Sequence, residues 1–578
     1  MKDEVVLAKK KEFVGFIENV LEEYQLSAEA TPEILNPSYI DFKKMAQNAL
    51  KQVKESELLV PLVGGFSAGK STAINALLGE EILPVAVTAE TAIPAEIRFA
   101  EEDYIIAIKT QENGAEESRH LVSELSTLSQ SASEYEVVKI YLNRPILRDI
   151  LPFTLVDMPG FESSNSAHNY SILRYITKGA FYFFLVNMKD GSLKKQDFIR
   201  LSEIYDLGRD FTVFLTKKDL SSAEEIEAIT KFVKEQVESE YGSHIDVRSV
   251  DSDDNDQFLN ALKQANPEEL FYRLNINLVK DVFYHAASDL NTALSGLKTD
   301  AQTIEKELSD LEESVINITL SRDQQIESIK SGTLIEVENR VVAKVESQLQ
   351  SSVQDLANSL GASSESFNKM ISDLVRGVLV SELNREIGRM SNDVVNRFSG
   401  SMNFNFKDVQ LEKDWANTLI DSLQSQIMSA LVSINSDGKN NSKIGTGIGA
   451  MLGGLAMAIP HPVIKVVMMV LPGIIGAIFD NVRASKEKEQ KINAIQSQVI
   501  PSVISSVRAE VSNVLVEVSN ILVKTVSDEF ERKLHDKKVI LDRAKGEHYE
   551  NVAQLEQAKS TLEGSLKNIN SLAEKIIA

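Results

Sequence analysis

The segment from residue 57 to residue 79, ELLVPLVGGFSAGKSTAINALLG, constrains the fold of this chain more than any other. It reads as an apolar strand, a glycine-rich turn and an amphipathic helix. Gly64 and Gly69 bracket four residues before Lys70 and Ser71, which gives the pattern G-x-x-x-x-G-K-S. Glycines in such a turn let backbone N–H groups face phosphate oxygens, while the lysine reaches the β- and γ-phosphates and the serine hydroxyl binds Mg²⁺. The segment therefore predicts a phosphate-binding loop in an α/β domain.

A second apolar strand, in FTLVDMPG, ends at Asp157, and Gly160 follows three residues later. A carboxylate at this point can hold Mg²⁺ through water, and the Gly160 amide can sense a γ-phosphate. The threonine next to Ser71, Thr72, is also expected to contact the nucleotide. Because both motifs follow strands that read as parallel α/β structure, we expect them at one edge of a mostly parallel sheet.

A third strand, in FTVFLTKKD, ends in Thr216, Lys217, Lys218 and Asp219. The Asp219 carboxylate can accept from two donors on a guanine edge, and the Lys217 stem can lie along the purine, whereas adenine lacks that donor pair. The set of motifs therefore predicts GTP rather than ATP as the nucleotide. The later segment VRSVDSDD, with Ser249, is a candidate for a further guanine contact.

The stretch LPVAVTAETAIPAEI, residues 83–97, reads as a loop followed by a strand. A GTP site with Mg²⁺ uses a mobile threonine that closes on the metal and the γ-phosphate, and Thr88 and Thr91 both fit that role. Taken alone, the stretch is equally compatible with an ordinary turn.

Together, GGFSAGKSTAINALLG, LPVAVTAETAIPAEI, DMPGF and TKKD resemble the GTPase domain of the dynamin superfamily, and Phe66-Ser67 with the NALLG helix is similar to its bacterial members. The resemblance covers residues 57–250. It implies a P-loop GTPase domain that uses GTP and Mg²⁺, and it favours Thr91 over Thr88 as the functional threonine of the second motif.

The resemblance also bears on the rate of hydrolysis. Many eukaryotic dynamins carry a glutamine that helps to order the catalytic water where this chain has Phe66, and Phe161 stands where Ras-type GTPases have theirs. We therefore expect slow hydrolysis by the isolated chain, with the water positioned by Ser67, Thr91 and a dimer partner. Ser67, Lys70 and Thr91 are the predicted catalytic residues.

The charge balance limits the partners of the chain. Its 578 residues carry 85 acidic and 61 basic side chains, a net charge of −24, which repels phosphodiester backbones and disfavours nucleic-acid binding. The absence of cysteine excludes disulfides and thiolate metal sites. The N-terminal sequence MKDEVVLAKKKEF lacks the features of a signal peptide, so we expect a cytoplasmic protein that associates peripherally with membranes.

Beyond about residue 266, helical periodicity replaces strand-like alternation. Apolar residues between positions 290 and 318 recur at alternating spacings of four and three. This spacing predicts one unbroken helix about 43 Å long. Similar stripes at 503–521 and 555–576 predict, with the first, an antiparallel helical bundle that forms an extended stalk.

Two amphipathic segments, 4–24 and 39–56, precede the nucleotide domain, and the polar stretch ATPEILNPS separates them. Since helices on both sides of a nucleotide domain can meet only by packing together, we expect a neck built from both ends of the chain. The expected division is N-terminal neck helices at 1–56, the GTPase domain at 57–265, neck and stalk helices at 266–443, an apolar tip hairpin at 444–480, and returning stalk and neck helices at 481–578.

The tip hairpin is almost wholly apolar, and in residues 444–479 only His461 and Lys465 are ionisable. Its two arms, joined at Pro460 and Pro462, are each about 24–26 Å long as helices, which is less than the roughly 30 Å hydrocarbon core of a bilayer. Residues 439–491 carry seven basic against three acidic side chains, a net charge of +4 that an anionic leaflet attracts. We expect peripheral contact with lipid; the alternative is a hairpin buried in the bundle core. The predicted membrane-contacting residues are Leu455, Ile459, Val463, Val467 and Met468.

Three functions are compatible with these features. The first is a dynamin-like GTPase that engages membranes through the stalk tip and couples GTP hydrolysis and head dimerisation to membrane remodelling, as a homo- or hetero-oligomer. The second is a GTP-loaded switch or scaffold with negligible turnover, which Phe66 and Phe161 favour. The third is a membrane-inserting, toxin-like helical protein, which the nucleotide motifs disfavour.

Overall fold

The structure is a computed structural model, and it describes residues 2–65, 67–85, 93–111, 114–131, 134–160, 178–206, 208–251, 255–299, 301–328, 334–362, 364–400, 414–420, 423, 488–546 and 552–577. The predicted tip hairpin lies outside the described residues, and so do its five predicted membrane-contacting side chains.

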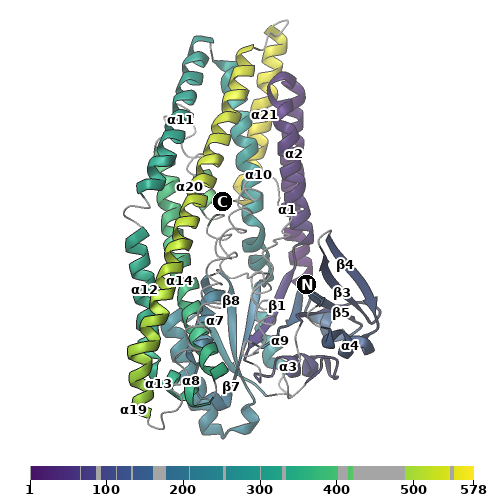
Figure 1. Cartoon of the computed structure of the whole chain (residues 1–578). Coiled ribbons are helices and arrows are strands. Elements are labelled where there is room, and N and C mark those ends of the chain that lie inside the picture. Colours follow the sequence, from purple (N-terminus) through teal and green to yellow (C-terminus); the bar gives the residue numbers. More distant parts are fainter. Residues whose placement is uncertain are drawn as a thin grey trace.

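A nine-stranded sheet organises the nucleotide domain (Figure 1). The strand order is β4-β3-β5-β2-β6-β1-β7-β8-β9. The run from β6 to β9 is parallel throughout, whereas β2 pairs antiparallel with β6, and β3 pairs antiparallel with β4 and β5. The strands are β1 Leu58–Gly64, β2 Ala95–Phe99, β3 Tyr104–Gln111, β4 Gly114–His120, β5 Val137–Leu142, β6 Phe153–Asp157, β7 Phe181–Asn187, β8 Asp210–Thr216 and β9 Asp246–Ser249.

The parallel strands are apolar runs because both of their faces are covered. Nearly every residue of β1, β6, β7 and β8 is buried, as expected for central strands of an α/β sheet. The helix α8 begins at a capping box, in which the Ser222 hydroxyl accepts from the Glu225 N–H. The helices of this domain are α3 Lys70–Leu78, α4 Leu125–Gln130, α5 Pro145–Asp149, α7 Lys195–Asp206, α8 Ala223–Tyr241 and α9 Asn255–Gln264, with single 3₁₀ turns at Val122–Glu124, Met188–Asp190 and Lys218–Leu220.

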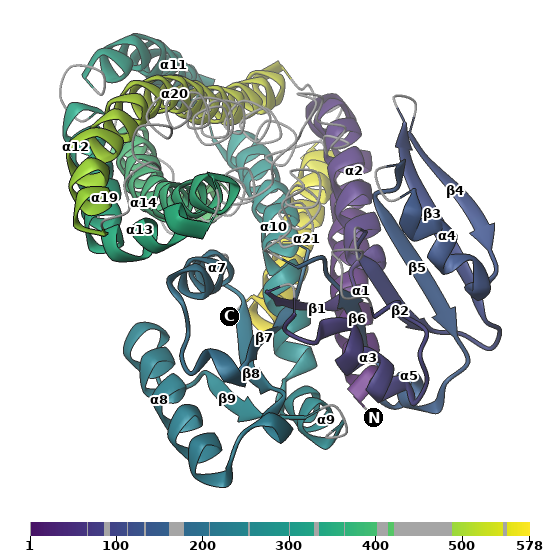
Figure 2. The same cartoon turned by 60° about the horizontal axis from the view of Figure 1, so that its bottom comes forward.

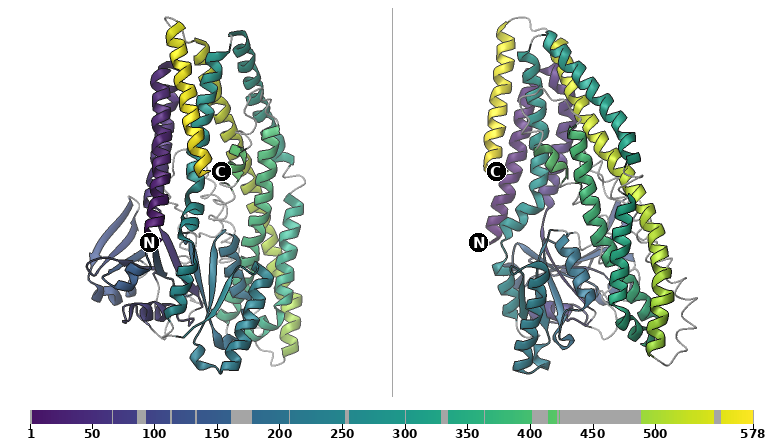
Figure 3. Two further views of the ribbon diagram at one scale, coloured as in Figure 1. Left: turned by 180° about the vertical axis from the view of Figure 1, so that it is seen from behind. Right: turned by 90° about the vertical axis from the view of Figure 1, so that its left-hand side faces the viewer.

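The two ends of the chain pack together as a neck. Helix α1 contacts α2, α10 and α21, and Figure 3 shows α1 and α21 side by side. Phe13, Tyr24 and Phe271 are buried where α1 meets its neighbours, and the Tyr24 hydroxyl donates to the Asp289 carboxylate at 2.7 Å. The neck helices are α1 Lys2–Ala30, α2 Pro32–Glu55, α10 Pro267–Lys298 and α21 Val552–Ile576, joined by the C-terminal part of α20 Ile500–Gly546.

The remaining helices form a trunk along α20. Helix α20 packs on α11, α12 and α14, and α14 also contacts α7, so the trunk lies alongside the nucleotide domain (Figure 2). The predicted fold class, an α/β domain with an extended all-α bundle, is confirmed. The trunk helices are α11 Ala301–Ser328, α12 Leu334–Ser351, α13 Val353–Ala362, α14 Ser364–Gly400 and α19 Lys488–Ala494, which continues through a π-helical turn, Ile495–Val499, into α20.

The prediction of one helix over residues 290–318 is wrong. Helix α10 ends at Lys298 and α11 begins at Ala301, because Thr299 takes an extended conformation (φ −100°, ψ 143°). Leu290 and Ile304, on either side of the break, are both buried, so the apolar stripe continues through two helices. The heptad spacing reports which face is buried and does not report whether the helix continues.

The stretch ATPEILNPS was expected to separate two helices, and most of it is helical instead. Helix α1 extends to Ala30 and α2 begins at Pro32, with Pro37 inside it. Proline suits the first position of a helix, because an N–H there has no helical partner to lose. Thr31 alone forms the junction, and its hydroxyl donates to the Ser27 carbonyl at 2.7 Å.

Within the described residues, one helical run, Glu489–Lys545, is long and apolar enough by length and composition to cross a membrane. Its Val503, Val507 and Val511 side chains are buried within the bundle. The most apolar 18-residue window of this run is 39% buried.

Candidate nucleotide-binding site

The phosphate-binding loop leaves the end of β1 in the parallel half of the sheet. A Cβ at Gly64 would lie 2.2 Å from the carbonyl oxygen of Leu185 in β7, so this position excludes a side chain. Gly69 has φ +86°, a left-handed conformation that glycine adopts readily, and α3 begins at the next residue. Both glycines of the motif are therefore needed for the backbone conformation of the loop, whether or not a nucleotide is bound.

The ammonium of Lys70 lies against the loop. Its Nζ donates to the Gly65 carbonyl at 2.8 Å and to the Gly64 carbonyl at 3.2 Å, and the side chain is buried. A lysine at the N-terminus of a helix, where backbone N–H groups are also available, makes a positive site that suits phosphate oxygens. Ser67 is exposed in the loop, and Thr72 is half-buried in the first turn of α3.

The neighbouring strand β6 brings a carboxylate to Ser71. The Ser71 hydroxyl donates to Asp157 Oδ2 at 2.7 Å, whereas Asp157 Oδ1 is buried and has no hydrogen-bond partner among the described residues. Burial raises the pKa of Asp157 to about 6, although the hydrogen bond from Ser71 and the charge of Lys70 act to lower it. A hydroxyl and a carboxylate with an unpaired oxygen can together hold a hydrated Mg²⁺ ion, directly and through water.

The TKKD segment is joined to the phosphate-binding loop by a side chain. The Thr216 hydroxyl, at the end of β8, donates to the Ala68 carbonyl at 2.9 Å and to the Val186 carbonyl at 3.2 Å. Lys217 has φ +61°, so the chain turns sharply before the 3₁₀ turn that contains Asp219. The Lys218 N–H donates to the Val250 carbonyl at 3.2 Å, directly after β9, which places the segment with Ser249 beside the TKKD segment.

Several predicted residues are not placed by the structure. Gly160 is the last described residue before a gap, three positions beyond Asp157. Thr91, Thr88, Phe66 and Phe161 lie outside the described residues, so their roles stay predictions.

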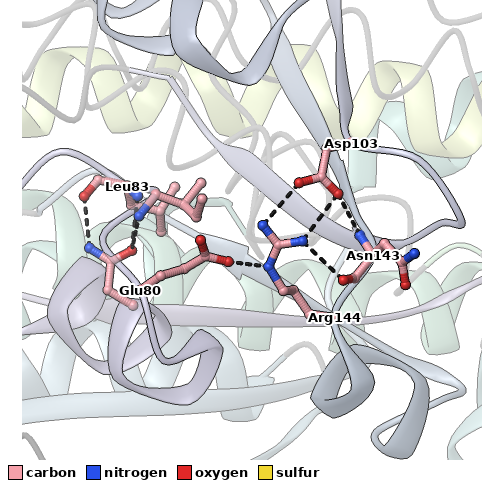
Figure 4. A network of polar contacts seen from close by, with 7 residues as sticks. Glu80, Leu83, Asp103, Asn143 and Arg144 are labelled. Carbon is pink, nitrogen blue, oxygen red and sulfur yellow. Dashed lines mark hydrogen bonds and ion pairs between the residues drawn. The ribbon is translucent and has the colours of Figure 1, made fainter.

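Two further residues near the site were missed by sequence reasoning (Figure 4). Asn75 of α3 binds the backbone of Ile82 and Leu83, and Arg144, two residues after β5, binds the carboxylate of Glu80. A buried polar residue inside the NALLG helix was a signal for Asn75. Arg144 carried no such signal, since Glu80 lies 64 residues away in the sequence.

A phosphate-binding loop after β1, the Ser71–Asp157 pair and a TKKD segment after β8 lie at the carboxyl edge of one parallel sheet, and this arrangement defines a P-loop GTPase. A sequence model of the dynamin family matches residues 60–219, which contain all three motifs. Residues 60–219 are therefore a dynamin-family GTPase domain, and this part of the chain is similar to bacterial dynamin-like proteins.

Relatives in two bacteria match part of the chain. It is 27% identical over 208 residues to dynamin-like protein 2 of Campylobacter jejuni, a match that covers 35% of this chain and 33% of that protein. It is 24% identical to dynamin-like protein A of Bacillus subtilis, over 33% of this chain and 22% of that protein. The matched region thus spans about a third or less of these relatives.

A solved bacterial structure aligns with most of the chain. It is an oligomerised bacterial dynamin pair, described as providing a mechanism for the long-range sensing and tethering of membranes, and the alignment covers 92% of this chain and 91% of that chain at 13% identity. The TM-score is 0.32, so this likeness places no residue of the present chain.

Proposed function

We propose that the chain binds GTP with Mg²⁺ at the loop after β1 and hydrolyses it to GDP and phosphate. The observation that carries this proposal is the Ser71–Asp157 contact, at 2.7 Å, with the second Asp157 oxygen buried and without a partner. Ser71 would ligate the metal directly and Asp157 would accept from a metal-bound water. The bound ion would neutralise charge on the β- and γ-phosphates.

The other motif residues divide between phosphate and base. Lys70 would exchange its two carbonyl partners for phosphate oxygens, and Asp219 would accept from guanine while the Lys217 stem lies along the ring. Thr216 would hold the base-binding segment next to the phosphate-binding loop, since its hydroxyl donates to the carbonyl of Ala68 in that loop. Ser67 and Thr91 would position the attacking water.

We further propose that residues 444–480 contact lipid and that pairing of the GTPase heads, between copies of this chain or with a related GTPase, couples GTP turnover to membrane remodelling. The apolar tip and its basic flanks support this proposal, as does the match of residues 60–219 to the dynamin family. The protein would then be cytoplasmic and peripherally bound to its membrane.

A second candidate function is a GTP-loaded switch or scaffold that turns over negligibly. Phe66 and Phe161 favour it, because neither can order a water as a glutamine does. Both candidates share the nucleotide site and differ in turnover, whereas in the toxin-like alternative the GTPase domain would be regulatory.

Calorimetric titration with GTP and ATP, with Mg²⁺ and with a chelator, tests the site. GTP should bind more tightly than ATP, and only Mg²⁺ should give full affinity. Lys70→Ala should abolish binding, with exposed Lys189→Ala as its matched control.

Asp219→Asn should reduce the preference for GTP by about tenfold or more, because hydrogen bonds to charged groups contribute about 1.5–3 kcal/mol. Exposed Asp149→Asn, on α5, is the control for this change. Equal affinity of the wild type for GTP and ATP would refute the assignment.

A further inference from the structure

Helices α10 and α20 come together toward the end of the molecule that is away from the nucleotide domain (Figure 1). Contacts between them extend from His285 and Arg532, where the imidazole Nε2 and a guanidinium nitrogen lie 2.8 Å apart, to the close approach of Gly296 and Ala544. Toward its other end α20 belongs to the trunk, since its Arg508 donates to a carboxylate of α12 at 2.6 Å. We call the place where α20 leaves α10, at His285 and Arg532, the fork.

Four carboxylates gather at the fork around one guanidinium. Glu529 is buried and accepts from two nitrogens of Arg532, at 2.5 Å and 3.2 Å. A third nitrogen of Arg532 donates to Asp536 at 3.3 Å. Asp281 lies one helical turn before His285, with 3.3 Å between its Oδ1 and the imidazole Nδ1. Arg532 is therefore shared between two carboxylates, and Glu529 takes most of it.

The fourth carboxylate, Asp289, ties α1 to the fork. Its Oδ2 accepts from the hydroxyl of Tyr24 at 2.7 Å, and the buried Tyr24 ring stacks on Phe42 of α2 with 4.3 Å between the ring centroids. Among the described residues Asp289 has no ion-pair partner, and no group of three or more metal-ligating side chains could hold a metal ion. The fork thus carries more carboxylates than cations, which leaves the proton as the counter-charge.

Two of these carboxylates bind protons more readily than usual in this packing. Burial raises the pKa of Asp289, and the charge of Asp536 also raises it, whereas the hydrogen bond from Tyr24 acts to lower it. Burial raises the pKa of Asp536 as well, against the charge of Arg532. The packing at the fork is therefore most stable below the ordinary carboxyl range, and stability is lost as the pH rises through the raised pKa values.

The neighbouring groups do not supply the missing positive charge. An arginine N–H only donates, so the contact with Arg532 requires an unprotonated His285 Nε2 and a neutral imidazole. His535, which also acts on Asp536, is exposed, and α2 contributes only the Ser38 hydroxyl beside Tyr24. Helices α11 and α21 form ion pairs with other residues of α10 and α20, namely Glu305–Lys545, Glu312–Lys538, Arg322–Glu531 and Glu563–Lys298.

We propose that Asp289 and Asp536 form a proton-dependent latch between the neck and the trunk. With a proton bound by this pair, α1, α10 and α20 pack together at the fork. With both carboxylates charged, α20 and the trunk separate from the neck on the nucleotide-domain side of the Gly296–Ala544 contact. Protons reach the latch from solvent, since the Asp536 side chain is 39% exposed. Water can hydrate the charged groups after separation, so opening at this point strands no buried charge.

Pulsed electron paramagnetic resonance on the full chain, without nucleotide, measures this separation. The chain has no cysteine, so Gln52→Cys on α2 and Ser347→Cys on α12, both at exposed positions, carry the only two spin labels. We expect one short distance at pH 6.0 and a second, longer distance whose share grows toward pH 8.5. The ratio of the two populations should rise by no more than about tenfold per pH unit for each proton released. Circular dichroism at each pH checks that the helices stay intact.

Variants assign the response to the two carboxylates. Asp289→Asn and Asp536→Asn keep the shape of the side chain without its charge, so each should lower the share of the longer distance at pH 8.5. The double variant should show the short distance at every pH. Asp542→Asn, at an exposed position of α20, is the matched control and should respond like the wild type. His285→Gln keeps an acceptor for Arg532 but cannot titrate, and it should also respond like the wild type.

Three results would overturn the latch. The first is a wild-type distance distribution that does not change between pH 6.0 and 8.5. The second is a change that persists in the double variant or, if that variant does not fold, in both single variants. The third is loss of the response in His285→Gln, which would assign it to the histidine. Because no nucleotide is present, these results do not depend on whether the chain binds GTP.

Discussion

At the scale of single residues, Asp157 belongs to the proposed nucleotide site, and its burial lowers the stability of the folded protein when the carboxylate is charged. Burial raises its pKa from 3.8 to about 6, against the opposing effects of Ser71 and Lys70. The folded state therefore binds a proton more readily than the unfolded state does. The contribution of Asp157 to the free energy of unfolding is fully present below about pH 4 and is lost as the pH rises through about 6. Above that pH the carboxylate is charged, and its Oδ1 has no hydrogen-bond partner among the described residues.

Asp157→Asn should therefore stabilise the nucleotide-free protein at pH 7.5, by about 1–3 kcal/mol, because it removes a buried charge and keeps the shape of the side chain. The gain should shrink as the pH falls toward 4. Denaturant unfolding in a chelating buffer at several pH values measures it, with Asp149→Asn as an exposed control. A variant that is less stable than the wild type at pH 7.5, or a gain that does not depend on pH, would contradict this assignment.

At the scale of elements, α10 and α20 approach each other closely at Gly296. A Cβ at Gly296 would lie 2.6 Å from the Cβ of Ala544, so these helices pack in contact only because residue 296 has no side chain. Gly564 in α21 is the opposite case, since nothing lies within 4 Å of a Cβ built there.

The two glycines give opposite predictions for one substitution. Gly296→Ala should destabilise the protein by about 1–3 kcal/mol, because α10 and α20 must separate. Gly564→Ala should stabilise it by about 0.5–1 kcal/mol, because alanine favours a helix interior and meets no neighbour. Thermal unfolding measures both, and Ala544→Gly should restore much of the stability of Gly296→Ala. Equal effects of the two substitutions would show that the neck does not depend on this contact.

The nucleotide motifs were predictable because their chemistry fixes residue types and spacing. Gly64, Lys70 and Ser71 lie within eight positions, and each strand end that follows is marked by an apolar run. The break between α10 and α11 was not predictable from periodicity, since the buried face continues across it. The contact between Arg144 and Glu80 could not be predicted from the sequence for another reason. The two residues are far apart in the chain and are brought together by the order of strands in the sheet.

At the scale of the whole molecule, residues 444–480 are the proposed lipid-contacting segment. Leu455→Asp and Val467→Asp should reduce binding to anionic liposomes, because burial of apolar surface contributes about 25 cal/mol per Å² and a charge opposes it. Their affinity for GTP should equal that of the wild type. Co-sedimentation measures binding, with Ile316→Asp, at a trunk residue that is 56% exposed, as the control. If the tip variants unfold while the wild type does not bind lipid, the hairpin belongs to the bundle core.

Phosphate release by the purified full chain, from GTP and from ATP, tests the central claim most directly. We predict Mg²⁺-dependent release from GTP alone, at a rate per molecule that rises with protein concentration and with anionic liposomes, because no water-orienting glutamine stands at Phe66 or Phe161. Lys70→Ala should abolish release and Thr91→Ala should reduce it. Release from ATP as fast as from GTP, or release that survives Lys70→Ala, would contradict the account.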